Sequence, residues 1–273
     1  MVSAMFTIIL LAFIFSFGLV HGSFLNVLIY RLPRKISIIS PMRSACPVCG
    51  AMIAWYDNIP VFSWLFLRGK CRHCNAPISI MYPFIELMSG ITAILAVYFF
   101  GITPTALIVF LFTSILIVIT IIDLQFMIIP DAINKPGMVI AIIIGGINEF
   151  TGMFEAPITS GIIDSLLGAA LGYGILYFIA WVYFKYAKVS GLGGGDIKLM
   201  GFTGALLGAN SIFPSILIAS FAGVFIGSAM LLIKRTGLKT EIPFGPWLAL
   251  GILCHMLGGD PSSFINSLLM MNR

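Results

Sequence analysis

Four cysteines in two Cys-x-x-Cys pairs are the clearest candidate chemistry in this sequence. The first pair is Cys46 and Cys49, and the second is Cys71 and Cys74. Each pair can turn two sulfur atoms toward one point, and two pairs about twenty residues apart suit tetrahedral zinc coordination. Four protein ligands leave no open position, so the predicted zinc is structural. A reduced, metal-free or redox-active tetrad is the alternative, and His73 is at most an alternative ligand.

Asp123 is the first of two candidate catalytic carboxylates. It follows the apolar run Thr105–Ile122 directly. A carboxylate there meets the negative end of the helix dipole, lies close to hydrocarbon and has no adjacent cation. Such a costly position predicts a functional role, with an exposed interfacial aspartate as the alternative.

Asp196 is the second candidate, because it follows a glycine-rich run. Gly191 and Gly193 to Gly195 precede it, and an apolar segment begins after it. A helix N-cap would account for an aspartate at this position. The glycines predict more, since they let the backbone turn sharply and let a peptide chain approach the carboxylate closely.

The other aspartates have simpler explanations. Asp131 and Asp164 stand where helices are expected to begin, Asp57 lies between the cysteine pairs, and Asp260 lies in the C-terminal tail. Each is interpreted as structural or solvated.

The elements that position these residues are predicted to be membrane helices. Of the 273 residues, 60% are hydrophobic and 9% are charged, with a mean hydropathy of +1.09, whereas a soluble domain is about one quarter charged. We therefore expect an all-α polytopic membrane protein of about eight transmembrane helices, with the zinc-binding loop between the first two. The spans are Ala4–Ile29 (a retained span, not a cleaved signal), Pro83–Phe100, Thr105–Ile122, Gly137–Ile147, Ile162–Tyr183, Ile197–Leu207, Ile212–Ile233 and Phe244–Leu257.

The basic residues predict the orientation. Fourteen of the fifteen lysines and arginines fall in or beside the loops after spans one, three, five and seven, and Arg273 is the exception. These loops are therefore expected in the cytoplasm and both termini outside, in an inner or plasma membrane. A cytoplasmic location disfavours disulfides and so favours zinc. The sequence has no basic tract interleaved with aromatic residues, so nucleic-acid binding is not predicted. The expected surroundings of the protein are membrane lipid.

This topology brings the two candidate carboxylates to one face. Span three would run inward and end at Asp123, while span six would begin at Asp196 on the same cytoplasmic side. Two carboxylates at one depth can share a proton and a water, one acting as general base and the other as general acid. The sequence alone does not show that the two spans touch.

These residues resemble the bacterial type IV prepilin peptidase family. Gly193-Gly194-Gly195-Asp196 matches the GxGD motif of membrane aspartic peptidases, and the segment from Ile122-Asp123 to Ile129-Pro130-Asp131 matches the one carrying the other catalytic aspartate, at Asp123 and not Asp131. Further similar segments are Gly22–Val27, Tyr30–Pro33, the two cysteine pairs, Asp57–Pro60, Ser63-Trp64, Tyr82-Pro83, Glu86-Leu87 and Pro243–Pro246. One departure is Met81, where the family often has an arginine.

The resemblance implies a bifunctional enzyme. It would cut basic leaders from prepilins or pseudopilins and then methylate the new N-terminal residue with S-adenosylmethionine. Residues 1–100 would hold the first span, the zinc loop and the second span, associated with methyl transfer, and residues 101–273 would form a six-helix peptidase domain. No dinucleotide-type glycine fingerprint marks the methyl-donor site, so the residues of that site are left unassigned.

Three alternative functions are considered: a peptidase without methyl transfer, a transporter and a non-catalytic scaffold. A peptidase-only GxGD enzyme is disfavoured by the cysteine loop and the N-terminal motifs. An ion-coupled transporter would use Asp123 and Asp196 to bind cations, but the glycine-rich segment has no repeat around Asp123. A non-catalytic zinc-bearing scaffold leaves the position of Asp123 unexplained.

Overall fold

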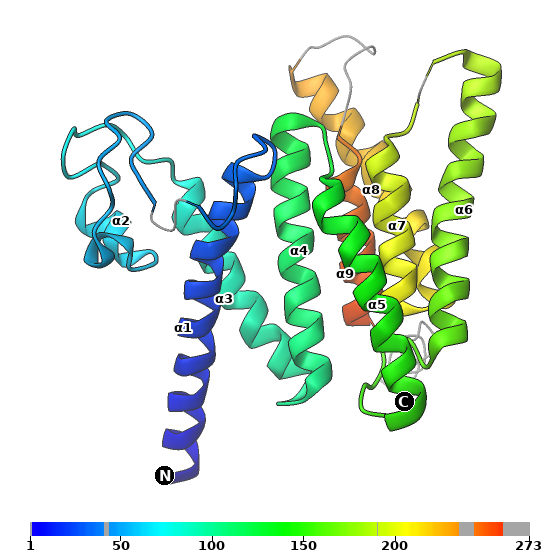
Figure 1. Ribbon diagram of the computed structural model, residues 1–273, viewed down its shortest axis with the longest axis horizontal. Helices are drawn as coiled ribbons and strands as arrows, with labels where there is room; N and C mark the ends of the chain where they lie inside the picture. The colour runs from blue at the N-terminus through cyan, green and yellow to red at the C-terminus, as the bar shows by residue number, and fades with distance from the viewer. Residues whose placement is uncertain (1, 41–43, 190, 235–242, 259–273) are drawn as a thin grey trace. The chain divides into compact units, whose positions relative to one another are not determined.

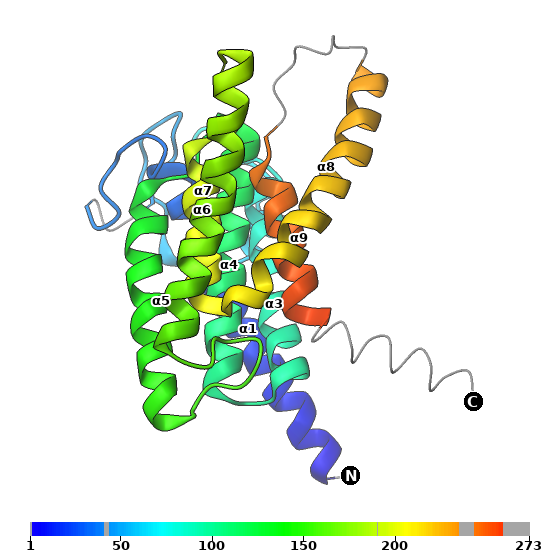
Figure 2. The ribbon, with the colours of Figure 1, turned by 90° about the vertical axis from the view of Figure 1, so that its right-hand side faces the viewer.

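Within residues 2–40, 44–189, 191–234 and 243–258, which the computed structural model describes, the chain is helical and contains no β-strand. This confirms the all-α expectation. The long helices are α1 (Val2–Arg31), α3 (Met81–Phe100), α4 (Pro104–Phe126), α5 (Asp131–Thr151), α6 (Ile162–Ala187), α7 (Gly194–Leu207), α8 (Ile212–Lys234) and α9 (Gly245–Gly258), shown in Figures 1 and 2. Each predicted span overlaps one of them.

Five segments in the described part of the chain are long and apolar enough to cross a membrane. They are Met5–Arg31, Met81–Phe100, Pro104–Phe126, Ile162–Ala187 and Ala209–Gly227. The protein is therefore a multi-pass membrane protein, and the larger number of eight crossings stays a prediction. α7 has 14 residues, which is roughly 21 Å of helix against a hydrocarbon thickness of about 30 Å.

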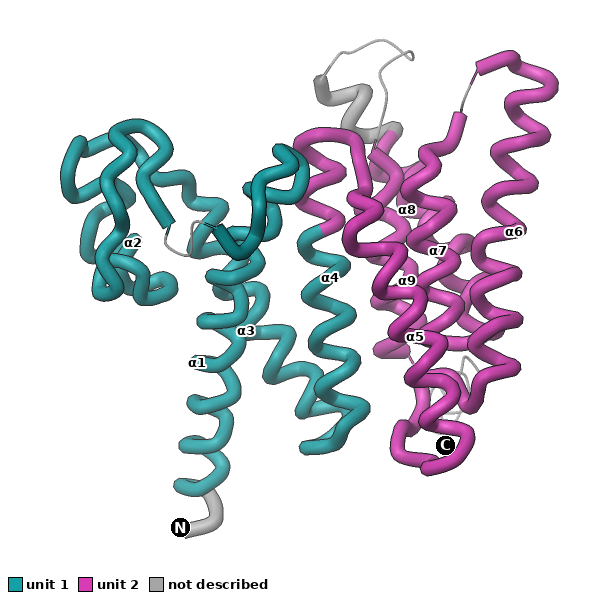
Figure 3. The backbone as a smooth tube through the Cα atoms, viewed as in Figure 1, with its two compact units in different colours: residues 1–118 teal, residues 119–273 magenta. Residues whose placement is uncertain are grey.

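The chain divides into two compact units, residues 1–118 and 119–273, coloured separately in Figure 3. In the first unit, α1 and α3 lie against each other, and glycines allow the close approach. A Cβ atom on Gly18 would lie 2.7 Å from the Cα of Gly90, and one on Gly22 would lie 2.6 Å from the Cα of Glu86. The segment between these helices carries the cysteines, the short α2 (Phe62–Phe66) and the 3-10 helix η1 (Trp55–Asn58).

In the second unit, consecutive helices alternate in direction, so the beginnings of α5, α7 and α9 lie at one end with the last residues of α4 (Figure 1). α6 and α7 touch through their backbones. A Cβ atom on Gly168 would lie 2.1 Å from the carbonyl oxygen of Gly204. Small residues are what membrane helices use to pack this closely, and this contact fixes α7, the helix that carries Asp196.

This contact predicts a large effect of a side chain at Gly168. Gly168→Ile must push α6 away from α7, so we expect a loss of roughly 1–3 kcal/mol in stability, or failure to accumulate. Thermal unfolding of the purified protein in detergent measures this loss. Gly174→Ile is the matched control, because nothing lies within 4 Å of its Cβ position on the same helix. Equal unfolding temperatures for the two variants would contradict the packing described.

Candidate active site and metal centre

The two cysteine pairs adopt the same local structure. In the first, the Cys46 N–H donates to the carbonyl of Ala51, and the Gly50 N–H donates back to the carbonyl of Cys46, both at 2.9 Å. The second pair repeats this pattern, with Asn75 donating to Cys71 at 2.9 Å. Gly50 and Asn75 both have positive φ, of 71° and 56°. This left-handed residue turns the backbone sharply after each Cys-x-x-Cys.

The four sulfur atoms converge on one point. The Sγ atoms of Cys46, Cys49, Cys71 and Cys74 all lie within 4.8 Å of one another, and those of Cys46 and Cys74 are 3.8 Å apart. A tetrahedron of sulfurs each about 2.3 Å from zinc has edges of about 3.8 Å, whereas a disulfide needs about 2.05 Å. The donor set therefore fits a tetrahedral metal ion.

The cysteine thiols differ in their acidity. N–H groups of Cys49 and Val48 point at the Cys46 sulfur and lower the pKa of that thiol to about 6. For Cys74, the Ala76 N–H acts in the same direction, but burial and the neighbouring thiols outweigh it and raise the pKa to about 12. Four thiolates repel one another, and a divalent cation is the group that stabilises them together.

Asp57 stabilises the segment between the two cysteine pairs by an ion pair with Arg72. Its two carboxylate oxygens accept hydrogen bonds from Arg72, at 2.7 Å from Nε and 2.5 Å from Nη2. These bonds lower the pKa of Asp57. Arg72 lies within the second Cys-x-x-Cys turn, here called the second knuckle (residues 71–75; the first is 46–50), and Asp57 lies in η1. The ion pair therefore links the second knuckle to η1. Asp57 is structural in this arrangement, as the sequence predicts.

Asp123 lies near the end of α4 and is only 5% exposed. Its Oδ2 atom accepts a hydrogen bond of 2.9 Å from the N–H of Gly245, the first residue of α9. The beginning of a helix carries partial positive charge, which stabilises a carboxylate there. The fit is tight, because a Cβ atom on Gly245 would lie 2.7 Å from Oδ2.

Asp196 lies in the first turn of α7 and is 7% exposed. Its Oδ1 atom is buried and has no hydrogen-bond partner among the described residues. The backbone before it is held from α5: the Asn134 side chain donates to the carbonyl of Gly195 at 3.3 Å, and a Cβ atom on Gly195 would lie 2.7 Å from Ile129. A buried polar atom without a partner is costly, so it is ready to bind water or a substrate group.

Within the second unit, Asp123 lies in the last turn of α4 and Asp196 in the first turn of α7, so the structure places both carboxylates at the same end of that unit. In the described residues, neither carboxylate pairs with a lysine or arginine. Asp131 differs, because Lys135 and Lys198 pair with it at 2.8 and 2.6 Å and lower its pKa. Two buried carboxylates without a cation can work as an acid–base pair.

Gly245 and Asn134 contact this site although no local pattern in the sequence predicts a role for either. Gly245 belongs to the Pro-Phe-Gly-Pro segment, which was recognised as a motif, but nothing local shows that its N–H meets a carboxylate 122 residues earlier. Asn134 is 1% exposed. Its one signal in the sequence is a polar side chain next to a predicted span. The predicted cytoplasmic residues Arg43, Arg235 and Lys239, with Asp260 and Arg273, lie outside the described residues.

Comparisons with known proteins agree with these features. Residues 16–100 match a model described as the bacterial peptidase A24 N-terminal domain, and residues 110–228 match the type IV leader peptidase family. Proteins named prepilin leader peptidase/N-methyltransferase are similar. The one from Xanthomonas campestris is 35% identical, covering 89% of this chain and 90% of its own. The one from Myxococcus xanthus is 38% identical over 84% of this chain and 66% of its own length. The one from Aeromonas hydrophila is 33% identical over 90% of this chain and 90% of its own length.

No solved structure matches the chain. The similarity to the named relatives extends over most of the sequence, and the two family-model matches include the segments that carry Asp123, Asp196 and the four cysteines. The chain belongs to the type IV leader peptidase family.

Proposed function

We propose that this protein cuts the leader from prepilins or pseudopilins with an aspartate pair and then methylates the new amino terminus from S-adenosylmethionine. The observation that carries the peptidase assignment is the pair of buried carboxylates, Asp123 and Asp196, at one end of the second unit without a cation. The names of the relatives, prepilin leader peptidase/N-methyltransferase, support both activities.

The cleavage chemistry follows from one proton shared by two carboxylates. The ionised one takes a proton from a water as its oxygen attacks the scissile carbonyl carbon, while the protonated one donates to the carbonyl oxygen. The proton held by the first carboxyl then passes to the amide nitrogen as the carbon–nitrogen bond breaks, and a hydroxyl proton of the intermediate returns to the second carboxylate as the carbonyl re-forms. The Gly245 N–H holds Asp123 in place, and the unpartnered Oδ1 of Asp196 is available to the water.

The proposed setting is an inner or plasma membrane, with the aspartates on the cytoplasmic side and both termini outside. The concentration of lysines and arginines in alternate loops supports this orientation. A basic leader would then remain in the cytoplasm while the apolar helix of the substrate lies in lipid beside the site. We assign methyl transfer to residues 1–100 and cleavage to residues 101–273; separate family matches over 16–100 and 110–228 support this division.

We assign a structural zinc ion to Cys46, Cys49, Cys71 and Cys74. The sulfur spacing that fits a tetrahedron supports this assignment. A bound zinc would cross-link the two knuckles and so hold the segment between α1 and α3, without taking part in the cleavage chemistry.

The transporter alternative has less support. A cation site would be expected to gather several oxygen ligands around the carboxylates, whereas Asp123 is bonded to a backbone N–H. A peptidase without methyl transfer is disfavoured by the match of residues 16–100 to the bacterial N-terminal domain.

The aspartate pair is tested by single substitutions that keep the side-chain shape. Asp123→Asn and Asp196→Asn should each lower prepilin cleavage by at least about 1,000-fold, because an amide can neither accept nor deliver the proton. Cleavage by purified protein in detergent is measured on gels. Asp131→Asn is the control and should stay close to wild type. Full cleavage by either of the first two variants would reject the pair.

Gly245 is tested through its contact with Asp123. Gly245→Ala places a methyl group against Oδ2, so we expect kcat to fall about 100-fold at an unchanged KM and unfolding temperature, since small displacements of reacting groups are costly. Gly258→Ala on the same helix, where nothing lies within 4 Å, should behave as wild type. If Gly245→Ala also cleaves normally, the N–H does not position Asp123.

The metal site is tested by elemental analysis. Wild-type protein should carry one zinc per chain, and Cys46→Ser should lose it, because hydroxyl groups are poor zinc ligands compared with thiolates. Cys254→Ser, which changes a cysteine outside the cluster, should keep the zinc. Zinc retained by Cys46→Ser at the wild-type level would refute the site.

A further inference from the structure

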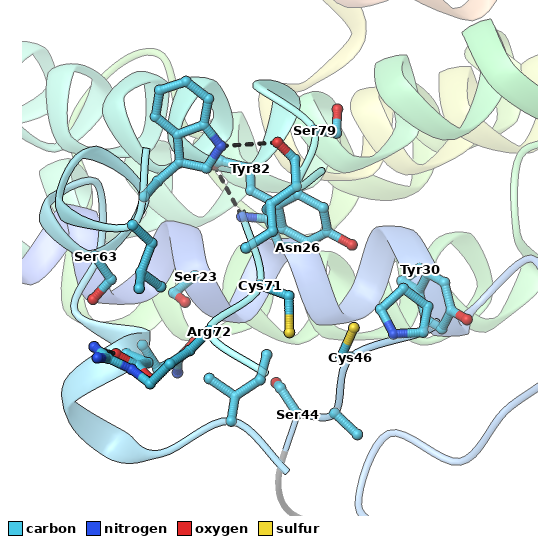
Figure 4. Close-up of a pocket in the computed structure, with 18 of the residues that line it drawn as sticks. Ser23, Asn26, Tyr30, Ser44, Cys46, Ser63, Cys71, Arg72, Ser79 and Tyr82 are labelled. Atoms are coloured by element: carbon cyan, nitrogen blue, oxygen red, sulfur yellow. Dashed lines mark hydrogen bonds and ion pairs between the residues drawn. The ribbon is translucent and has the colours of Figure 1, made fainter. Parts of the chain in front are cut away.

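Three asparagine side chains are buried in the described part of the chain, and they differ in how their polar atoms are used. Asn26, Asn134 and Asn148 are 8%, 1% and 6% exposed. Asn26 donates to the carbonyl of Tyr82 at 3.1 Å, beside a cavity of about 650 Å³ between α1, the cysteine-bearing segment and the start of α3 (Figure 4). The other two lie on one helix, α5, so their hydrogen bonds can be compared directly.

Asn148 uses its whole carboxamide to hold the loop after α5. Its Nδ2 atom donates to the carbonyls of Phe154 at 3.0 Å and Thr159 at 2.8 Å. Its Oδ1 atom accepts the N–H of Phe154 at 2.8 Å. Because both polar atoms have partners, the cost of burying this side chain is offset within the fold. Asn148 is therefore a structural residue.

Asn134 uses only half of its carboxamide. Its Nδ2 atom donates to the carbonyl of Gly195 at 3.3 Å, whereas its Oδ1 atom is buried and has no partner among the described residues. Asparagine is also less favourable than alanine inside a helix. Stability of the fold therefore does not explain this side chain, and a buried acceptor of this kind indicates a group that donates a hydrogen bond to it.

The contact with Gly195 places Asn134 beside the cleavage site, because Asp196 is the next residue. The Oδ1 atoms of Asn134 and Asp196 are two of the four buried side-chain polar atoms that lack a partner in the described ranges. The same two helix beginnings are already joined by the ion pair of Asp131 and Lys198, at 2.6 Å. Asn134 is thus not needed merely to tie α5 to α7.

We propose that Asn134 is a further residue of the cleavage site: its Nδ2 atom positions the segment that carries Asp196, and its Oδ1 atom accepts a hydrogen bond from the attacking water. The inference rests on the peptidase half of the proposed function and adds a residue to it. A buried water needs several polar partners, and the two unpartnered oxygens supply acceptors for it. An amide oxygen is neutral, so it orients the water without competing for its proton.

The cleavage step balances with Asn134 unchanged. One O–H bond of the water breaks as its proton moves to the ionised carboxylate of the pair, and the oxygen forms a bond to the scissile carbonyl carbon. The second hydrogen stays on that oxygen, which becomes a hydroxyl of the tetrahedral intermediate and still donates to Asn134. Because the contact orients the water and not the peptide, its effect falls on kcat and not on substrate binding.

Asn134→Ala tests this role. Prepilin cleavage by the full chain in detergent should lose about tenfold or more in kcat at an unchanged KM, because the water loses an acceptor. The unfolding temperature should equal or exceed that of the wild type, since the substitution removes an unpartnered buried atom and adds a better helix former. Cleavage at the wild-type rate would overturn the inference. A lower unfolding temperature with wild-type kcat in the folded protein would overturn it too.

Two further variants separate catalysis from folding. Asn148→Ala is the matched control on α5: it removes three hydrogen bonds, so the unfolding temperature should fall while the folded protein keeps its kcat. Asn134→Ser returns an acceptor hydroxyl and leaves room for the water, so kcat should recover to within about threefold of the wild type. A serine variant as slow as Asn134→Ala would contradict a hydrogen bond from the water to this side chain.

These measurements keep the inference separate from the proposed function. Loss of cleavage in Asp123→Asn and Asp196→Asn, together with normal cleavage in Asn134→Ala, would retain the aspartate pair and remove Asn134 from the site. Absence of cleavage by the wild type would refute the peptidase assignment, and this inference with it.

Discussion

Hydrocarbon supplies no hydrogen bonds, so a carboxylate buried at the end of a membrane helix must be stabilised by the chain itself. Asp123 meets this constraint through the N–H of Gly245 at the beginning of α9. Asp196 meets it only in part, because its Oδ1 has no partner among the described residues. α5, α6 and α9 all pack against α7, the helix that carries Asp196.

Close backbone packing is the means by which these helices are held. Gly168 and Gly204 let α6 and α7 touch without side chains between them, and Gly195 lies against Ile129 before α5. Such contacts leave little freedom for α7 to slide or rotate. The first unit uses the same device between α1 and α3, where Gly22 lies against Glu86. Two of these glycines, Gly22 and Gly195, make their close contacts at or beside an acidic residue, Glu86 and Asp196.

The cysteine segment and the cavity are parts of one structure within the first unit. Cys46 and Cys71 line the cavity, while the ion pair between Asp57 and Arg72 ties the second knuckle to η1. A metal bound by the four sulfurs would fix the wall of the cavity without touching the reacting atoms. With four sulfur ligands such a metal would have no open position, which is why the proposed zinc is structural.

The sequence by itself determined the membrane class, the helices and the chemistry-bearing residues, because these depend on local patterns: long apolar runs, Cys-x-x-Cys spacing and a glycine run before Asp196. Only the tertiary structure decided which groups meet across long separations. The N–H of Gly245 on Asp123, Asn134 on the carbonyl of Gly195, and Asn26 on the carbonyl of Tyr82 all arise from helix packing. Local sequence patterns do not predict these contacts. Each contact depends on how a helix is rotated and shifted along its axis, and distant parts of the chain determine both.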